Sequence, residues 1–274
     1  CFAGHVDVVP PGDAKLWSHP PFAAEIEGDL LYGRGAADMK GAIACFTAAA
    51  LDYVKGRGRE IDGSISLLIT GDEEGPAING TRKVLAWMKE QGERPDHCLV
   101  GEPTNTKRIG EAIKIGRRGS LNGWLKVTGV QGHVAYPHLA NNPVKGLVKI
   151  LARFYDAPLD YGSAHFSPSN LEVTTIDVGN PTVNMIPAFA EARFNVRFND
   201  RHSTDALKAQ LRQQAILALS GTDLEFSLEF DPPSDCFLTE PGPLDALLSE
   251  AVSEITGLTP SLSTDGGTSD ARFI

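Results

Sequence analysis

Residues 64–75 read S-I-S-L-L-I-T-G-D-E-E-G, and this stretch decides the fold. Its first seven residues are a mostly apolar run of strand length, and three acidic side chains follow almost at once. A short, nearly continuous apolar run is typical of a strand buried in a parallel sheet. We therefore expect residues 64–70 to be a central parallel strand whose carboxyl end presents Asp72, Glu73 and Glu74.

Strand and helix patterns alternate on both sides of this stretch. Residues 1–9 read C-F-A-G-H-V-D-V-V and end at Pro-Pro-Gly, which predicts a strand running into a loop. Residues 97–100 predict another short strand, while residues 39–55 and 81–91 have helical composition. This alternation predicts an α/β domain with a mostly parallel sheet.

The middle of the chain has a different pattern. Alternating or β-rich segments predict antiparallel strands, and two longer segments predict helices: strands at 119–128, 171–177, 189–198 and 224–230, helices at 143–155 and 205–219. We expect a compact α+β domain with a four-stranded antiparallel sheet plus two helices. A helix at 244–255 and a strand at 261–264 are expected to return to the first domain. The expected division is therefore 1–118 and 232–274 for the α/β domain and 119–231 for an inserted domain.

Charge and composition exclude several classes of protein. The chain has 274 residues and a formal net charge of −10, which argues against a general nucleic-acid binder. No apolar run reaches the roughly 20 residues that a membrane-spanning helix needs, and the Ala-rich residues 41–51 are expected to form a buried helix. The four cysteines are far apart along the chain, which favours buried, reduced thiols and a cytoplasmic location.

Acidic and histidine side chains follow each expected strand of the α/β domain. His5 and Asp7 lie at the first strand, Asp38 precedes the Ala-rich helix, and Glu102 follows residues 97–100. Carboxyl ends of parallel strands meet at one sheet edge, so these groups should converge there with Glu74 and its neighbours. Each motif alone could be a polar loop or a solvated turn. Together they predict a divalent metal site, and the ligand set accommodates zinc, cobalt or manganese.

Five segments of the chain match the motifs of a known family: G-H-V-D-V-V-P-P-G at 4–12, Y-G-R-G-A-A-D-M-K-G at 32–41, L-I-T-G-D-E-E-G at 68–75, V-G-E-P-T at 100–104 and S-T-D-G-G-T-S-D-A-R-F at 263–273. Through these segments the chain resembles the M20 family of di-zinc aminoacylases and carboxypeptidases. The resemblance implies a catalytic domain at 1–118 and 232–274. It also implies that 119–231 form a dimerisation or lid domain, that the enzyme is a homodimer, and that the chain is a fragment lacking both termini.

The resemblance also implies roles for the acidic groups. His5 and Glu102 would bind one metal ion, Glu74 the second, and Asp38 both, with two Zn2+ or Co2+ ions as cofactors; a further histidine ligand of the second ion would lie beyond the chain's end. Glu73 would be the general base. Asp7 would place its carboxylate on the far ring nitrogen of His5 and so fix its tautomer. The peptide bond after Asp38 is expected to be cis.

Further residues are implied to contact an anionic small-molecule substrate. In Q-G-H-V-A-Y-P-H at 131–138, His133 would reach across the dimer interface and stabilise the oxyanion in the partner's site. Arginine suits carboxylates because its guanidinium donates two parallel hydrogen bonds. The implied substrate contacts are Arg117, Ser120, Tyr136, Asn184, Arg197, Gly266, Gly267 and Thr268.

The function that the resemblance implies is metal-dependent hydrolysis of the amide bond of an N-acylated amino acid carrying three carboxylates, in amino-acid biosynthesis. The stretch I-K-I-G-R-R-G-S-L at 113–121 discriminates best for this member of the family. A sister deacylase with the same metal chemistry is one alternative. A non-catalytic dimerisation module with an inherited fold is the other.

Overall fold

The computed structural model describes residues 1–58, 60–267 and 269–274. The chain divides into two compact units, which we describe separately. The first unit comprises Cys1–Ile113, Pro241–Ser261 and Ser269–Ile274, and the second comprises Lys114–Glu240 and Leu262–Thr268.

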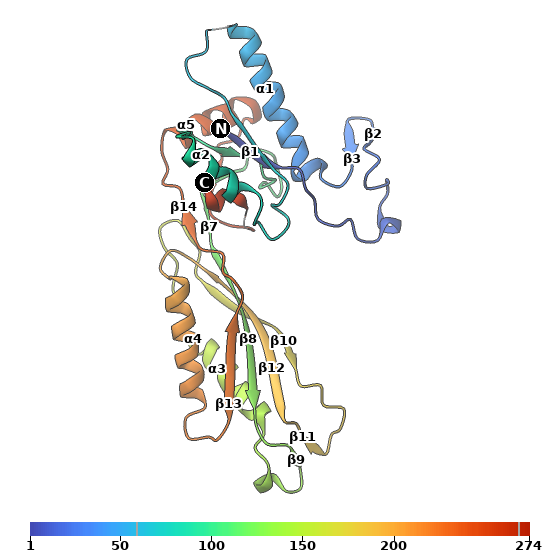
Figure 1. The fold of residues 1–274 in the computed structure, drawn as a ribbon, viewed down its shortest axis with the longest axis vertical. Coiled ribbons are helices and arrows are strands. Elements are labelled where there is room, and N and C mark those ends of the chain that lie inside the picture. The colour runs from blue at the N-terminus through green and yellow to red at the C-terminus, as the bar shows by residue number, and fades with distance from the viewer. Residues whose placement is uncertain (59, 268) are drawn as a thin grey trace. The chain divides into compact units, whose positions relative to one another are not determined.

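A three-stranded parallel sheet forms the centre of the first unit (Figure 1). In the described residues, β1 (Phe2–His5) lies between β4 (Leu67–Thr70) and β5 (Leu99–Val100). The expectation of a central position for residues 64–70 is therefore wrong: β4 is at one edge, and alternate residues of it are exposed. Only one face of β4 is covered, although its sequence is apolar on both.

Helices pack around this sheet. The α-helices of the first unit are α1 (Gly41–Arg57), α2 (Thr81–Glu90) and α5 (Pro243–Thr256). On α1, the ring of Phe46 stacks on Phe2 of β1 with centroids 4.7 Å apart. The expectation that residues 41–51 are buried is wrong, because no residue of α1 is buried. The Ala-rich sequence favours the helix through its propensity, whereas burial depends on what packs against it.

Shorter elements connect these helices and strands. The first unit also contains a hairpin of β2 and β3, and both units contain single turns of helix. Their bounds are β2 (Glu25–Glu27), β3 (Leu30–Tyr32), η1 (Ala14–Leu16), η2 (Ala36–Lys40), η3 (Pro137–Leu139) and η4 (Asp270–Phe273). Within η2, the peptide bond between Asp38 and Met39 is cis, as the resemblance implies.

The second unit is built on a four-stranded antiparallel sheet in the order β10-β12-β8-β13. Its strands are β8 (Gly119–Thr128), β10 (Asn170–Asp177), β12 (Phe189–Phe198) and β13 (Glu225–Phe230). In β8 and β12 every second residue is buried, which is the period-two pattern of a sheet with one covered face. The segments for which the sequence predicts an antiparallel sheet thus form one.

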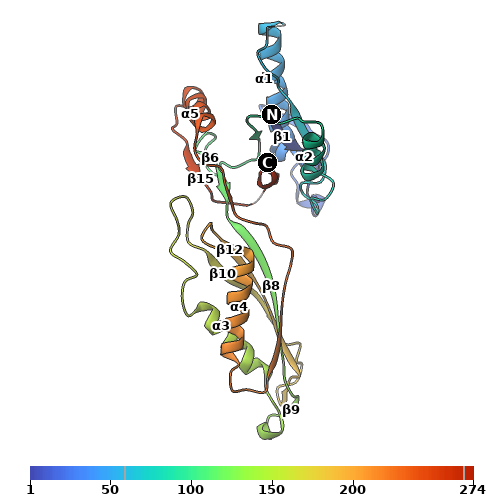
Figure 2. The same ribbon diagram turned by 60° about the vertical axis from the view of Figure 1, so that its left-hand side comes forward.

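Two helices, α3 (Pro143–Tyr155) and α4 (Thr204–Ala218), lie side by side against this sheet (Figure 2). Each starts at a capping side chain: Asn142 accepts a hydrogen bond from Val144 N, and Ser203 accepts one from Ala206 N. The core between helices and sheet consists of aliphatic and phenylalanine side chains, among them Leu121, Leu125, Ile150, Phe194, Leu207 and Leu211. This core fixes β8 and β12, which carry Ser120 and Arg197, two of the residues expected to contact substrate.

Short strands complete the fold. In the second unit β7 (Gly116–Arg117) pairs with β14 (Phe237–Leu238), and β9 (Gly132–His133) pairs with β11 (Met185–Ile186). The remaining strands are β6 (Ala112–Lys114) and β15 (Ser261–Ser263). The mixed α/β class is confirmed, while the division into a catalytic and a dimerisation domain stays a prediction.

Two observations bear on composition. In the described part of the chain, no helix is both long and apolar enough to cross a membrane. All four cysteines are free thiols, but the expectation of burial is wrong, because Cys45 is exposed and Cys1, Cys98 and Cys236 are half-buried. Cys45 lies on α1, whose side chains are incompletely covered in this structure.

Candidate functional site

The carboxyl ends of the parallel strands bring together a cluster of one histidine and several carboxylates. His5 ends β1 and lies beside Thr70 at the end of β4. Glu73 and Glu74 follow β4, and Glu102 follows β5 by two residues. Because parallel strands end at the same edge, residues nearly a hundred positions apart in sequence meet there.

Two groups in this cluster have spacings that suit a metal ion. His5, Asp38 and Glu102 each offer one ligand atom, and these atoms lie within 4.8 Å of one another. The same holds for His5, Glu73 and Glu74. The structure thus brings together the four residues expected to bind metal and the expected general base.

The imidazole of His5 is oriented by its neighbours. Nε2 lies 3.1 Å from Asp38 Oδ1 and 3.7 Å from Glu102 Oε1, and the residue is 1% exposed. Nδ1 lies 2.9 Å from the backbone carbonyl oxygen of Asp7. A carbonyl can only accept, so Nδ1 carries a proton and the lone pair of a neutral ring lies on Nε2, facing the carboxylates.

The carboxylate of Asp7, which the sequence places against His5, also accepts hydrogen bonds from a neighbouring loop. Its nearest oxygen is 3.4 Å from Nδ1 of His5, so the close contact to that nitrogen comes from the backbone carbonyl of the same residue. The two carboxylate oxygens instead accept hydrogen bonds from the backbone N–H groups of Glu73, at 3.3 Å, and Glu74, at 3.0 Å. Asp7 therefore holds the loop that carries both glutamates.

The cluster has an excess of negative charge. Burial raises the pKa of Glu102 to about 7, and the carboxylates of Glu73 and Asp38 add to the rise. Burial also raises the pKa of Glu73, with the charge of Asp270 as the next cause. Burial acts to lower the pKa of His5, but the hydrogen bond to Asp7 and the charges of the glutamates outweigh it, so that pKa is raised.

These shifts and the donor types fit a divalent cation. A buried carboxyl group whose pKa is raised to about 7, as that of Glu102 is, is stabilised as an anion when a cation enters. One imidazole nitrogen with several carboxylate oxygens suits zinc, cobalt or manganese. The residues at this sheet edge therefore fit a divalent metal ion.

Sequence reasoning missed Asp270 at this site. This residue lies in η4, is 7% exposed, and its Oδ2 accepts a hydrogen bond from the hydroxyl of Thr81 at 2.7 Å. Its charge acts on Glu73. The motif S-T-D-G-G-T-S-D-A-R-F contains Asp270, but nothing in its spacing links it to the start of α2.

The second unit brings together three of the residues expected to contact substrate or oxyanion. His133 in β9 pairs with Met185, next to Asn184, whose carbonyl accepts from Val134 N at 3.0 Å. The ring of Tyr136 lies 5.9 Å from that of His133. The side chain of His133 accepts a hydrogen bond from Ala135 N at 3.1 Å and is exposed.

Other residues expected to contact substrate form two pairs in the second unit, Ser120 with Arg197 and Arg117 with Gly266. Ser120 of β8 and Arg197 of β12 are directly opposite across the sheet. Arg117 is 7% exposed and donates from Nη1 to the carbonyl of Asp265 at 2.8 Å, beside Gly266. Gly267 follows and is exposed, while Thr268 lies outside the described residues.

The fold and this site define an α/β protein with a histidine–carboxylate centre at the strand ends, a class that includes metal-dependent hydrolases. The chain belongs to Peptidase family M20/M25/M40, whose profile matches residues 1–274.

Among curated proteins, relatives that share more than half of this chain's residues carry one enzyme name. The chain is 57% identical to succinyl-diaminopimelate desuccinylase of Rhodopseudomonas palustris (strain TIE-1), over all of this chain and 71% of that protein. It is 58% identical to the protein of the same name from Xanthobacter autotrophicus, again over 71% of that protein.

Solved structures share the fold at low identity. Aminopeptidase PepT from Bacillus cereus superposes with a TM-score of 0.73 at 17% identity, covering 99% of this chain and 68% of that one. An M20 family metallo-carboxypeptidase from Sulfolobus solfataricus gives 0.66 at 18% identity, covering 99% and 73%. At these identities the comparison shows the fold alone.

Proposed function

We propose that this chain hydrolyses the amide bond of N-succinyl-LL-2,6-diaminopimelate, releasing succinate and LL-2,6-diaminopimelate in lysine and diaminopimelate biosynthesis. The observation that carries this function is 56–58% identity to succinyl-diaminopimelate desuccinylases over the full chain. The chain is an enzyme of a hydrolytic family. Of the functions weighed above, a sister enzyme such as acetylornithine deacetylase has no comparable support here.

The proposed cofactors are two divalent metal ions, Zn2+ or Co2+. The residues that would hold them are His5, Asp38, Glu74 and Glu102, supported by the ligand-atom spacing and the raised pKa of Glu102. When bound, such ions polarise the amide carbonyl and lower the pKa of water, so that hydrolysis proceeds at neutral pH.

Glu73 is the proposed general base. Its carboxyl group takes a proton from the attacking water and passes it to the departing amine. A carboxylate with a raised pKa suits both steps, because it accepts the proton strongly enough and then remains acidic enough to give it up. Asp7 serves this step by holding the backbone of the loop that carries Glu73.

Positive and polar groups of the second unit are the proposed substrate contacts. The substrate carries three carboxylates, and a chain with a net charge of −10 needs local cations to bind it. Arginine guanidinium groups and exposed backbone N–H groups meet this need. The proposed contacts are Arg117, Ser120, Tyr136, Asn184, Arg197, Gly266, Gly267 and Thr268.

The homodimer and the cytoplasmic location remain proposals. Residues 119–231 are the proposed dimerisation domain, and His133 of one protomer is proposed to stabilise the oxyanion in the partner's site. The exposed position of His133, away from the core of its own unit, supports this role. Light scattering on the purified full-length protein measures the oligomeric state, and a monomer would remove this part of the proposal.

The substrate assignment is tested by comparing two substrates. Full-length protein loaded with Zn2+ or Co2+ is assayed with N-succinyl-LL-2,6-diaminopimelate and with N-acetylornithine. We expect a larger kcat/KM for the succinylated substrate. Faster turnover of acetylornithine would overturn the assignment while leaving the metal chemistry in place.

The role of Glu73 is tested by Glu73→Ala with Glu90→Ala as a matched control. Loss of a general base lowers kcat about 10²–10⁴-fold. Glu90 is an exposed glutamate at the end of α2, so its removal should leave kcat unchanged. Equal activity of both variants would mean that Glu73 is not the base. Metal content measured on the same samples shows whether either variant has lost its ions.

A further inference from the structure

We propose that Asp160 is a positioning residue for the Gly266–Gly267 loop, acting through the segment 161–169. This inference rests on the proposed function, which assigns Gly266 and Gly267 to substrate binding. All residues involved belong to the second unit. Asp160 itself is in none of the motifs on which the function rests.

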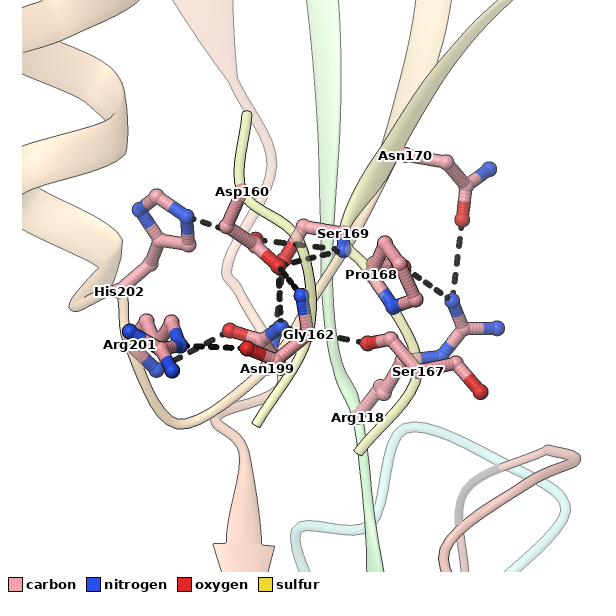
Figure 3. A network of polar contacts seen from close by, with 10 residues as sticks. All are labelled: Arg118, Asp160, Gly162, Ser167, Pro168, Ser169, Asn170, Asn199, Arg201 and His202. Atoms are coloured by element: carbon pink, nitrogen blue, oxygen red, sulfur yellow. Dashed lines mark hydrogen bonds and ion pairs between the residues drawn. The ribbon is translucent and has the colours of Figure 1, made fainter. Parts of the chain in front are cut away.

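The carboxylate of Asp160 is the centre of a polar network (Figure 3). It accepts hydrogen bonds from Gly162 N at 2.7 Å and from Ser169 N at 3.2 Å, and Asn199 Nδ2 donates at 2.6 Å. His202 Nε2 lies 2.9 Å from the other oxygen. Burial acts to raise the pKa of Asp160, but these hydrogen bonds outweigh it and hold the pKa well below the usual range.

This network closes the segment 161–169 into a loop. Gly162 and Ser169 lie near its two ends, and both donate to the same carboxylate. The side chain of Asp160 is only 7% exposed, so water competes little for these bonds. Removing the charge weakens the contacts at both ends of the loop at once, because both N–H groups donate to this one carboxylate.

The tip of this loop holds the chain just before the two glycines. The carbonyl of His165 accepts a hydrogen bond from the hydroxyl of Thr264 at 2.5 Å, and Thr264 is 4% exposed. Ser167 Oγ lies 3.5 Å from Asp265 Oδ1, a weaker contact. Phe166, between these residues, is 4% exposed and fixes the tip in the unit.

Arg117 holds the same stretch of backbone. Its Nη1 donates to the carbonyl of Asp265, and a Cβ added at Gly266 would lie 3.0 Å from that nitrogen. Gly266 has a φ of +96°, a backbone conformation that residues with a Cβ rarely adopt. Thr264 is therefore bonded to the loop tip, and Asp265 contacts both the loop tip and Arg117. These hydrogen bonds fix the backbone just before Gly266 and Gly267, and so set the position of both glycines.

A shift of the loop tip is thus expected to move the backbone that binds substrate. Small displacements of positioning groups are costly, because binding geometry is set within about an ångström. If Asp160 were only a stability element, its loss would lower the melting temperature without a specific effect on KM. The two roles differ in what they change, so they can be separated.

The test uses Asp160→Asn, Thr264→Val and the double variant in the full-length, metal-loaded protein. Thr264→Val removes the hydroxyl that reaches the loop and leaves the Asp160 network intact, so it tests the last contact even if Asp160→Asn fails to fold. Asp177→Asn is the matched control, since Asp177 also accepts a backbone N–H, from Gly179 at 3.1 Å, at an exposed turn of the same unit.

We expect each single variant to raise KM for N-succinyl-LL-2,6-diaminopimelate about five- to tenfold, with kcat within about twofold of wild type. The double variant should raise KM no more than the larger single effect, because both act through one chain of contacts. Hydrogen exchange of residues 262–267 should be faster in both single variants and unchanged in Asp177→Asn.

Additive effects on KM, an unchanged KM in Thr264→Val, or unchanged exchange in residues 262–267 would each overturn the inference. If wild-type protein does not hydrolyse this substrate, the proposed function fails. In that case hydrogen exchange still decides whether Asp160 positions the segment, so the two failures are distinguishable.

Discussion

Asp7 offers the sharpest test of how the loop that carries Glu73 and Glu74 is held. Its carboxylate accepts the backbone N–H groups of Glu73 and Glu74, whereas the close contact of Nδ1 of His5 is with the backbone carbonyl of Asp7. Substitution of the side chain removes the first contacts and keeps the second. Asp7→Ala and Asp7→Asn should therefore disturb Glu73, the proposed general base, more than His5, a proposed metal ligand.

The magnitude follows from the two hydrogen bonds. A hydrogen bond to a charged group contributes about 1.5–3 kcal/mol. The bonds here are 3.0 and 3.3 Å long and the Asp7 side chain is 23% exposed, so we take the lower end for each. Asp7→Ala then removes about 3 kcal/mol of the free energy that holds the loop in place, which lowers kcat about 10²-fold. Asp7→Asn retains one acceptor oxygen and should lose about tenfold.

The assay is kcat at saturating Zn2+ together with the dissociation constant for the metal. We expect kcat to fall about tenfold in Asp7→Asn and about 10²-fold in Asp7→Ala, and to stay low at saturating metal, because the loop that carries Glu73 is released. Metal affinity should fall as well, since Asp7 also holds the backbone of Glu74, a proposed metal ligand. Asp13→Ala is the control, because Asp13 accepts the backbone N–H of Lys15 at 3.0 Å on the exposed surface of the same unit. The reasoning would be refuted if excess metal restored kcat of the Asp7 variants to the wild-type value.

Three further outcomes are expected. Gly101→Ala places a Cβ within 2.6–2.7 Å of side-chain atoms of α1 and should lower the free energy of unfolding by about 1–3 kcal/mol. Gly56→Ala adds a Cβ in open space on α1 and should raise the free energy of unfolding by about 0.5–1 kcal/mol. Thermal unfolding measures both changes. Burial raises the pKa of Glu102 from 4.5 to about 7, so the folded metal-free protein keeps a proton that the unfolded chain releases, and stability should fall as pH rises through this window. Melting temperatures of chelator-treated protein across pH 4.5–7 follow this loss. Asp270→Asn removes a charge that raises the pKa of Glu73, so the acid limb of the pH profile of kcat/KM should move to lower pH.

Each of these outcomes has a result that contradicts it. Equal melting temperatures for the two glycine variants would mean that the packing of Gly101 against α1 is looser than described. A pH dependence that survives in Glu102→Gln would assign it to another group. An acid limb that stays in place in Asp270→Asn would mean that another group controls the pH profile.

Much of the architecture was predictable from periodicity. The burial of every second residue in β8 and β12 is visible in the sequence, because alternating apolar and polar residues are typical of a strand in a sheet with one covered face. The cluster around His5 was predictable for a related reason: acidic residues follow the strands, and parallel strands end at one edge. The exposure of α1 was not, because an Ala-rich helix is compatible with both burial and exposure.

By itself the sequence determined the strand and helix segments, the meeting of His5 with the carboxylates, and membership of the M20 family. Only the tertiary structure decided which atom of Asp7 contacts His5, that Asp270 lies near enough to Glu73 to raise its pKa, and that Asp160 closes a loop. Hydrogen bonds depend on tenths of an ångström and on the direction of each donor, whereas a sequence pattern records only which face a residue occupies. Thr81 and Asp270 are 189 positions apart, and no periodicity extends over that distance.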